Sequence, residues 1–198
     1  MQHWIDLTQE VGPDLPIYAE ADYRDPPFEA RPWSRIAENG FEVWQLSLGT
    51  QTGTHIDAPR HFLEGGASLE TLPMDACTGP YHYVSKEELG TETAGCSYSG
   101  ERILFLDAHP ELTVSNATLT RLIALPPLVW IMAGALTIGD PDPFRLNRAL
   151  AEAGKFLVED LDPQHVSKVP VRGEAIVMPL RLMNVSGSPV RLLVRAVP

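Results

Sequence analysis

The sequence contains little cysteine and no long apolar run. Cys77 and Cys96 are its only cysteines, and their spacing is not that of a zinc ribbon. A disulfide between them is neither required nor excluded, and free buried thiols in a reducing cytosol are the expected state. The longest apolar stretch, residues 122–135, is interrupted by two prolines and is shorter than the ~20 residues that span a bilayer. The N-terminus lacks the basic and apolar regions of a secretory signal, so we expect a cytoplasmic protein.

Basic residues are scarce as well. The chain has 15 Lys and Arg against 26 Asp and Glu, a formal net charge of -11. Nucleic-acid binders need a basic face to meet phosphates, and anionic membranes attract basic segments, so both classes are disfavoured. With 44% hydrophobic and 21% charged residues in 198, the composition is that of a soluble globular protein, and we expect one domain over residues 1–198.

Predicted strands and helices alternate in the middle of the chain but not at its ends. Ser115 and Asp142 are expected to begin helices that Pro126 and Gly154 end. Trp44, in the first clear strand, is expected to pack in the core. A mixed α/β fold follows, a β core flanked by helices. The predicted strands cover residues 41–48, 81–84, 102–107, 128–133, 156–158, 175–180 and 190–197.

One stretch, residues 51–62, holds most of the chemistry: Gln51, His55, Asp57 and His61. His55 and Asp57 are two positions apart, so in an extended backbone their side chains leave the same face. Gln51 and His61 lie at even offsets from them. Gly53 allows a turn or a close approach of the backbone. We therefore expect a short rigid platform that presents imidazole, carboxylate and carboxamide groups in one direction.

Two interpretations of this stretch follow from residue types alone. His55, Asp57 and His61 could bind a divalent cation, zinc or manganese, and leave a position open for water. Alternatively, a polar loop simply contains two histidines, one of which caps backbone groups while the other is exposed. The residue types by themselves do not decide between these interpretations.

Several motifs resemble those of the cyclase family of metal-dependent hydrolases, which includes bacterial kynurenine formamidases. Residues 51–61 are similar to that family's signature, His-x-Gly-Thr-His-x-Asp-x-Pro-x-His. Four further segments resemble its opening, its continuation, its acidic ligand strand and its closing hairpin, and they occur in the same order: 5–8, 65–66, 157–161 and 187–191. The resemblance covers most of the chain. It implies a swivelling β/β/α fold and a homodimer or higher homo-oligomer.

The resemblance also implies roles for individual residues. His55, Asp57 and Glu159 fall on metal ligands, and His61 falls on the general acid/base, a role suited to an imidazole that titrates near neutrality. Two positions depart from the pattern, because Gln51 and Asn147 stand where the family has histidines. Carboxamides are weak zinc ligands. An intact two-metal centre is therefore not expected, and either one divalent metal or none remains.

Three functional hypotheses follow. The first is a metal-free cyclase for a small carbonyl compound, for example an aromatic or polyketide natural product, and the loss of two imidazoles favours it. In this case the catalytic residues are His61, which moves a proton, with Asp57 and His55, and Gln51, which stabilises an enolate or oxyanion. Asn147 and Glu159 bind the substrate. The second is a hydrolase of amides or lactones that uses one metal on His55, Asp57 and Glu159. The third is a catalytically silent binding protein on the same scaffold.

Overall fold

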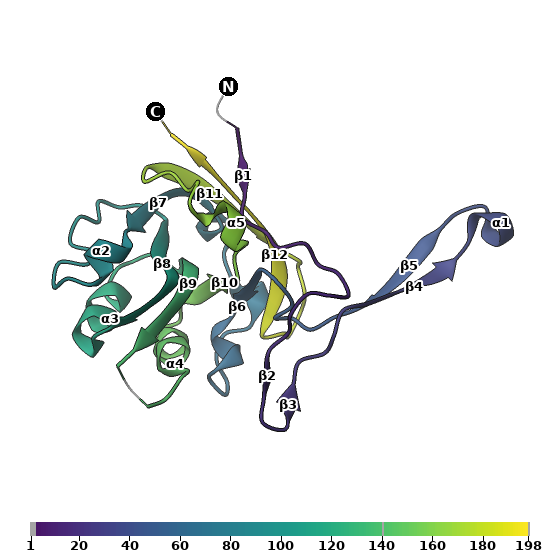
Figure 1. Cartoon of the computed structure of the whole chain (residues 1–198), viewed down its shortest axis with the longest axis horizontal. Coiled ribbons are helices and arrows are strands. Elements are labelled where there is room, and N and C mark those ends of the chain that lie inside the picture. The colour runs from purple at the N-terminus through teal and green to yellow at the C-terminus, as the bar shows by residue number, and fades with distance from the viewer. Residues whose placement is uncertain (1–2, 140, 198) are drawn as a thin grey trace.

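The computed structural model describes residues 3–139 and 141–197, which form a mixed α/β fold around one large sheet (Figure 1). This sheet has eight strands in the order β1-β12-β11-β7-β8-β9-β10-β6, and a further pairing between β12 and β6 closes all of them except β1 into a ring. Its strands are β1 (Ile5–Asp6), β6 (His55–Asp57), β7 (Thr78–Val84), β8 (Ile103–Val114), β9 (Val129–Ile138), β10 (Phe156–Glu159), β11 (Gly173–Pro179) and β12 (Gly187–Ala196). The predicted mixed α/β fold, a β core flanked by helices, is confirmed.

Alternation along the strands divides the core into two layers. In β8, Ile103 and Phe105 belong to the hydrophobic cluster that fills one face of the ring, whereas Leu104 and Leu106 belong to a second cluster. The second cluster also includes Leu119 and other apolar side chains of the helices. Strands buried on both faces explain why 102–107 and 128–133 read as continuous apolar runs.

Three short α-helices cover the second face of the sheet. In Figure 1, α2, α3 and α4 lie together on one side of β8, β9 and β10. Ser115 caps α3 as predicted, because its hydroxyl accepts a hydrogen bond from the Thr118 N–H at 3.1 Å. The α-helices are α1 (Ile36–Asn39), α2 (Lys86–Leu89), α3 (Asn116–Ile123), α4 (Arg145–Glu152) and α5 (Pro163–Val166), and the 3-10 helices are η1 (Pro59–His61), η2 (Leu69–Thr71) and η3 (Met74–Ala76).

Within residues 3–139 and 141–197, no helix combines the length and the apolar character needed to cross a membrane. Cys77 is buried, Cys96 is exposed, and both are free thiols. The free thiols agree with the expectation, but the expected burial is found for Cys77 and is wrong for Cys96.

Two hairpins precede the site and stand outside the main sheet. β2 (Ala19–Glu20) pairs with β3 (Tyr23–Arg24), and β4 (Glu29–Ser34) pairs with β5 (Val43–Ser47). The β4–β5 hairpin, with α1 at its tip, projects far from the body as an arm (Figure 1). The prediction that Trp44 packs in the core is wrong, since half of this residue is exposed (50%). The strand itself was predicted correctly, but no second layer covers it.

A buried lysine links the segment that follows α4 to the loop that precedes β9. Lys155 is 8% exposed, and its Nζ donates hydrogen bonds to the carbonyl oxygens of Leu125 (2.7 Å) and Pro127 (3.0 Å). Burial lowers the pKa of this ammonium group. The two hydrogen bonds compensate for the cost of placing a charge there.

We expect Lys155→Met to lower the free energy of unfolding by about 1–3 kcal/mol, because the Leu125 carbonyl loses the Lys155 donor and the Pro127 carbonyl keeps only its hydrogen bond from Trp130 Nε1 at 3.3 Å. Chemical denaturation followed by circular dichroism measures this. Lys168→Met, at an exposed position, is the control and should change stability by less than about 0.5 kcal/mol. Equal stabilities of the two variants would contradict the role given to Lys155.

Candidate active site

The pairing of β6 with β10 creates the site. These strands are antiparallel, with Glu159 directly opposite His55 and Leu157 directly opposite Asp57. Side chains that face each other in this way, and those on the adjacent diagonal, lie on the same face of a sheet and within reach of one another. Ile56 and Val158 point to the other face, into the cluster inside the ring. Three polar side chains are therefore gathered on the face that α4 covers.

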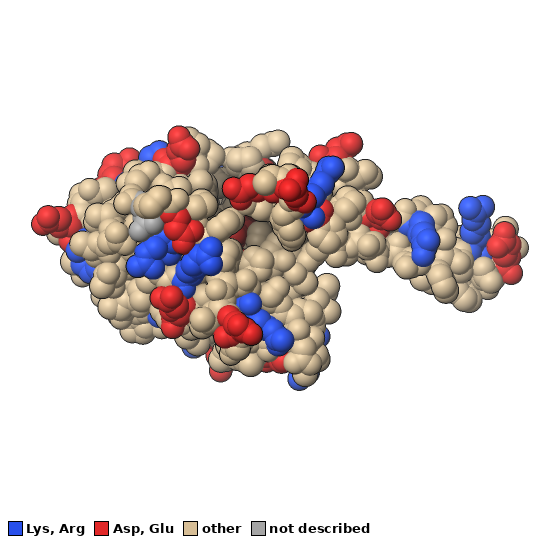
Figure 2. All heavy atoms as spheres, turned by 90° about the horizontal axis from the view of Figure 1, so that it is seen from below, with Lys and Arg blue, Asp and Glu red and all other residues tan. Residues whose placement is uncertain are grey.

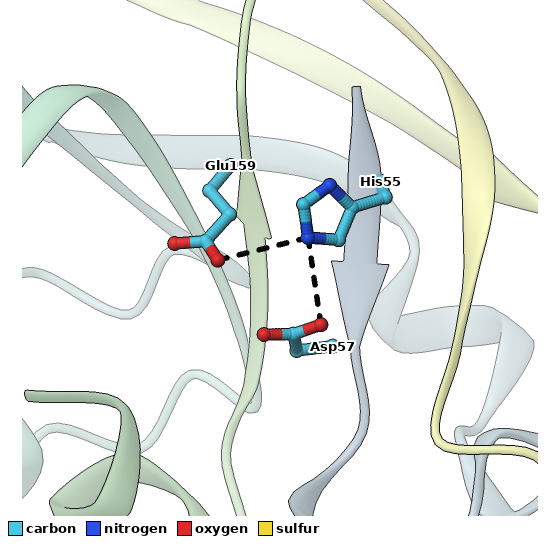
Figure 3. A group of neighbouring side chains, drawn as sticks. All are labelled: His55, Asp57 and Glu159. Atoms are coloured by element: carbon cyan, nitrogen blue, oxygen red, sulfur yellow. Dashed lines mark ion pairs between the residues drawn. The ribbon is translucent and has the colours of Figure 1, made fainter. Parts of the chain in front are cut away.

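His55, Asp57 and Glu159 converge on one point (Figure 3). His55 Nε2 lies 3.5 Å from Asp57 Oδ1 and 3.6 Å from Glu159 Oε1. One ligand atom from each residue lies within 4.8 Å of those of the other two. His55 and Asp57 are almost fully buried, whereas Glu159 is partly exposed. The prediction that residues about a hundred positions apart meet in one place is confirmed.

The cluster holds two carboxylates close together in a largely buried environment. Burial raises the pKa of Asp57 to about 8, and the neighbouring charge of Glu159 adds to this effect. Burial alone would lower the pKa of His55, but its contact with Glu159 and the charge of Asp57 raise it to about 9. Asp57 Oδ2 is buried and has no hydrogen-bond partner within residues 3–139 and 141–197. The cluster therefore lacks positive charge, and protonated His55 supplies part of it.

The backbone before β6 fixes the orientation of His55. Gly53 has a φ of 63°, which places its carbonyl oxygen 2.7 Å from His55 Nδ1. A carbonyl can only accept, so Nδ1 carries a proton and Nε2 faces the carboxylates. Metal-ligating histidines are commonly held by such a hydrogen bond at the second ring nitrogen. The predicted use of Gly53 for a turn is confirmed.

Gln51 lies beside Asp57 and donates to it. Its Nε2 is 3.4 Å from Asp57 Oδ1, while its Oε1 accepts a hydrogen bond from the Thr50 hydroxyl at 2.6 Å. Gly187 is opposite Asp57 on β12, and a β-carbon at this position would come within 2.6 Å of Gln51 Nε2. The hairpin glycine thus leaves room for the amide. Gln51 is a hydrogen-bond donor to the cluster in this arrangement.

Asn147 reaches the same region from α4. A small pocket beside Asp57 is lined by Phe62, Asn147, Leu150 and Lys155. The sequence-predicted convergence of Gln51, Asp57 and Asn147 is therefore found, although their roles stay predictions. Lys155 was not predicted here. Its only signal in the sequence is a charged residue directly before an apolar strand.

His61 lies at the outer edge of the site. The extended platform ends at Asp57, because Pro59 begins the 3-10 turn η1 that contains His61. The predicted extended geometry from residue 51 to residue 61 is therefore wrong outside residues 55–57. Burial and the charge of His55 lower the pKa of His61, against the raising effect of Glu159. These charges act on His61 because the turn keeps it close to the cluster.

A row of aromatic rings leads outward from His61. Ring centroids are 4.4 Å apart for His61 and Phe62, 5.4 Å for Phe62 and Phe144, and 6.1 Å for Phe144 and Tyr18. Tyr23 contacts Tyr18 in turn, at 6.3 Å. Three of the tryptophans do not join this row. Trp33 and Trp44 are on the arm, and Trp4 packs under Arg195. Phe62 and Phe144 were missed, since isolated aromatic residues look like core.

The sequence of this chain is similar to those of known proteins. Residues 5–115 match the family model described as putative cyclase. The chain belongs to the cyclase family. It is similar to the kynurenine formamidase of Geobacillus thermodenitrificans, at 29% identity over 98% of both chains, and to that of Bacillus mycoides, at 26% identity over the same shares. It is an enzyme of this kynurenine formamidase-like kind.

Solved structures of the cyclase family share the fold. Isatin hydrolase A from Labrenzia aggregata superposes with a TM-score of 0.81 at 18% identity, covering 100% of this chain and 94% of that one. A structure described as a potential metal-dependent hydrolase with cyclase activity superposes with a TM-score of 0.70 at 19% identity over the full length of both chains. At these identities the likeness concerns the fold.

The raised pKa values predict how stability of this cyclase-family enzyme depends on pH in a chelating buffer. Folded Asp57 and His55 hold protons that the unfolded chain releases at lower pH. Their stabilisation is present at low pH and is lost as the pH rises through about 8 and about 9. We expect the thermal unfolding midpoint to fall from pH 6 to pH 9.

Asp57→Asn removes one of these groups and should flatten the fall. Asp75→Asn, at an exposed position, should keep the wild-type slope. Differential scanning fluorimetry in EDTA measures all three proteins. A wild-type midpoint that rises over this pH range would contradict the electrostatic account of the cluster.

Proposed function

We propose that this enzyme hydrolyses an amide or lactone bond in a small aromatic substrate with the help of one divalent cation. The observation that carries the proposal is the convergence of His55 with the carboxylates of Asp57 and Glu159 on one point. The names of the similar proteins, kynurenine formamidase and isatin hydrolase, support a hydrolase of this type.

The cluster fits a cation. One imidazole nitrogen and two carboxylate oxygens suit zinc or manganese, and three protein ligands leave a position open. The unpaired Oδ2 of buried Asp57 and the excess of negative charge support the same reading. When bound, such a cation would polarise the substrate carbonyl and lower the pKa of a water molecule. His55, Asp57 and Glu159 would hold it, and Gln51 would steady Asp57 through its amide N–H.

His61 is the group placed to move the proton. Burial and the charge of His55 lower its pKa, which favours a neutral ring that can accept a proton at neutral pH. As the oxygen of water bonds to the carbonyl carbon, the ring takes the proton from this water. The ring then gives the proton to the nitrogen or oxygen that leaves as the bond to the carbonyl carbon breaks.

The aromatic rings support an aromatic substrate. Phe62 packs between His61 and Phe144 and also lines the pocket beside Asp57. Offset or edge-on contact with such rings stabilises a bound aromatic group. A flat ring held there would place a carbonyl substituent near the cluster. Asn147, which lines the same pocket, would hydrogen-bond a polar group of the substrate.

A metal-free cyclase is the second candidate, and the arrangement of Gln51 favours it. The carboxamide directs its N–H to Asp57 and its oxygen to Thr50. A donor so placed could stabilise an oxyanion without a metal. Metal content separates the two candidates. A third candidate, a silent binding protein, is excluded if the enzyme turns over substrate through His61.

For a one-cation enzyme, we expect about one equivalent of zinc or manganese per purified chain. Glu159→Gln should lower this to below about 0.1 equivalent and remove activity, because one of three ligands is lost. Glu152→Gln, on the exposed side of α4, is the control and should keep both. Plasma mass spectrometry gives the metal content. Full activity of the metal-free wild-type enzyme would contradict the proposed requirement for a metal and favour the metal-free cyclase.

We expect His61→Ala to lower kcat by about 10²- to 10⁴-fold without changing metal content, since His61 is not in the ligand cluster. Initial rates with an aromatic formamide and with isatin as probes test this. The control is His109→Ala, which removes an exposed imidazole outside the ligand cluster. This variant should keep kcat within twofold of the wild-type value. An unchanged kcat in His61→Ala would remove His61 from the mechanism.

Two sequence predictions concern the protein as a whole. That residues 1–198 form one domain, and that the enzyme acts in the cytoplasm on a small molecule, stay predictions.

A further inference from the structure

The pairing of β6 with β10 is short, and the ligand cluster lies at its end. Three residue pairs make up this pairing: Asp57 with Leu157, Ile56 with Val158, and His55 with Glu159. β6 begins at His55 and β10 ends at Glu159, so their pair is the last rung of the ladder. Backbone pairing at the end of an element opens more readily than pairing in its middle. Two of the three candidate ligands therefore lie on the rung that opens most easily.

A side-chain hydroxyl closes this end of the ladder. Thr54 directly precedes His55 and Asp160 directly follows Glu159, so Thr54 and Asp160 stand where the next pair would be. The Thr54 hydroxyl donates a hydrogen bond to the Asp160 carbonyl oxygen at 2.7 Å. Thr54 is almost fully buried (1% exposed), and a hydrogen bond away from water is electrostatically stronger than one in water. The hydroxyl thus takes the place of a backbone rung.

The backbone of Asp160 turns its carbonyl towards these donors. Its φ of 56° lies in the left-handed region, which few residues other than glycine adopt. Such a conformation costs free energy and persists only where surrounding contacts hold it. Here the carbonyl accepts two hydrogen bonds, from the Thr54 hydroxyl and from Gln9 Nε2 at 2.8 Å. Both donors therefore stabilise the turn that directly follows Glu159.

Gln9 brings the N-terminal segment into this arrangement. Its backbone N–H donates to the Thr54 hydroxyl oxygen at 2.9 Å, so this hydroxyl accepts one hydrogen bond and donates another. We call the hydrogen bonds among Gln9, Thr54 and Asp160 the clasp. A β-carbon at Gly53 would lie 4.0 Å from Gln9 Cβ, and the Gly53 carbonyl orients His55. The clasp therefore adjoins the backbone on both sides of the His55–Glu159 rung.

We propose that Thr54 and Gln9 are positioning residues, which hold the rung between His55 and Glu159 closed and thereby set the affinity of the cluster for a divalent cation. Neither of them belongs to the ligand group, and both act through the backbone next to it. Residues that orient metal ligands commonly change metal affinity or activity by about 10- to 100-fold. This inference rests on the proposed one-cation function.

Repulsion inside the cluster is the force that the clasp opposes. The charge of Glu159 disfavours ionisation of Asp57, so without a cation the two carboxylates separate if the end rung opens. Figure 2 shows acidic and basic side chains interspersed over the described part of one face of the molecule. A face of mixed sign attracts a cation only weakly. Affinity would therefore depend on the spacing of the ligand atoms drawn in Figure 3.

The test is the zinc dissociation constant, measured by competition with a chromogenic chelator. Thr54→Val keeps the shape of the side chain but removes the hydroxyl, and should raise this constant by about 10-fold or more. Thr54→Ser restores the hydroxyl and should bind zinc as tightly as the wild type. Gln9→Met removes one donor to the Asp160 carbonyl and should raise the constant by about 3-fold.

Thr8→Val is the matched control. The Thr8 hydroxyl makes the same kind of paired contact away from the ligands, since it donates to the Leu192 carbonyl at 3.4 Å and accepts from the Leu192 N–H at 2.9 Å. The segment stays anchored in this variant, because the Asp162 N–H still bonds to the Leu7 carbonyl at 2.9 Å. We expect a lower thermal unfolding midpoint and an unchanged zinc constant. An equal loss of zinc affinity in Thr8→Val and Thr54→Val would mean that Thr54 acts on stability alone.

A second measurement separates the clasp from the proposed function. In EDTA, the buried Nδ1–H of His55, which bonds to the Gly53 carbonyl at 2.7 Å, should give a slowly exchanging proton signal by NMR. Thr54→Val should broaden this signal, and Thr8→Val should keep it. An unchanged signal or an unchanged zinc constant in Thr54→Val would overturn the clasp. A wild type that binds no zinc, with a broadened signal in Thr54→Val, would overturn the proposed cation and leave the positioning role standing.

Discussion

The antiparallel pairing of β6 with β10 is the constraint on which the site depends. Its register places Glu159 opposite His55 and leaves Asp57 on the same face. A slip of β6 by one residue would send His55 and Asp57 into the apolar interior of the ring and separate them from Glu159. The ring resists this slip, because Ile56 and Val158 belong to its buried cluster. Hydrophobic burial on one face thus fixes chemistry on the other, and β12 holds β6 from the opposite side.

The closed sheet stabilises a fold that contains an electrostatically unfavourable cluster of side chains. Burial and mutual repulsion raise the pKa of Asp57, so the cluster opposes folding unless something positive meets it. His55 meets part of this need, and a divalent cation would meet it more fully. Burial of the surrounding apolar clusters provides a favourable free energy of folding that offsets the unfavourable electrostatics of this arrangement. Functional sites commonly break the rules that the rest of a fold obeys.

Two carboxamide side chains adjoin the carboxylate of Asp57. Gln51 donates a hydrogen bond to it, and Asn147 lines the pocket beside it. Gln51 donates to the carboxylate, and Gly187 makes space for it. Two neutral hydrogen-bonding groups therefore lie next to the buried carboxylate of Asp57.

The sequence alone determined the local features. Alternation gave the buried strands, Ser115 gave a helix start, and the spacing of His55 and Asp57 gave a common face, because each depends on neighbours within a few residues. Tertiary structure decided the rest. The sequence could not show that Trp44 is exposed, since exposure depends on whether another layer covers β5. Nor could spacing reveal that Phe62 and Phe144 meet, or that Lys155 lines the pocket. Those contacts join distant segments, and only closure of the sheet brings these segments together.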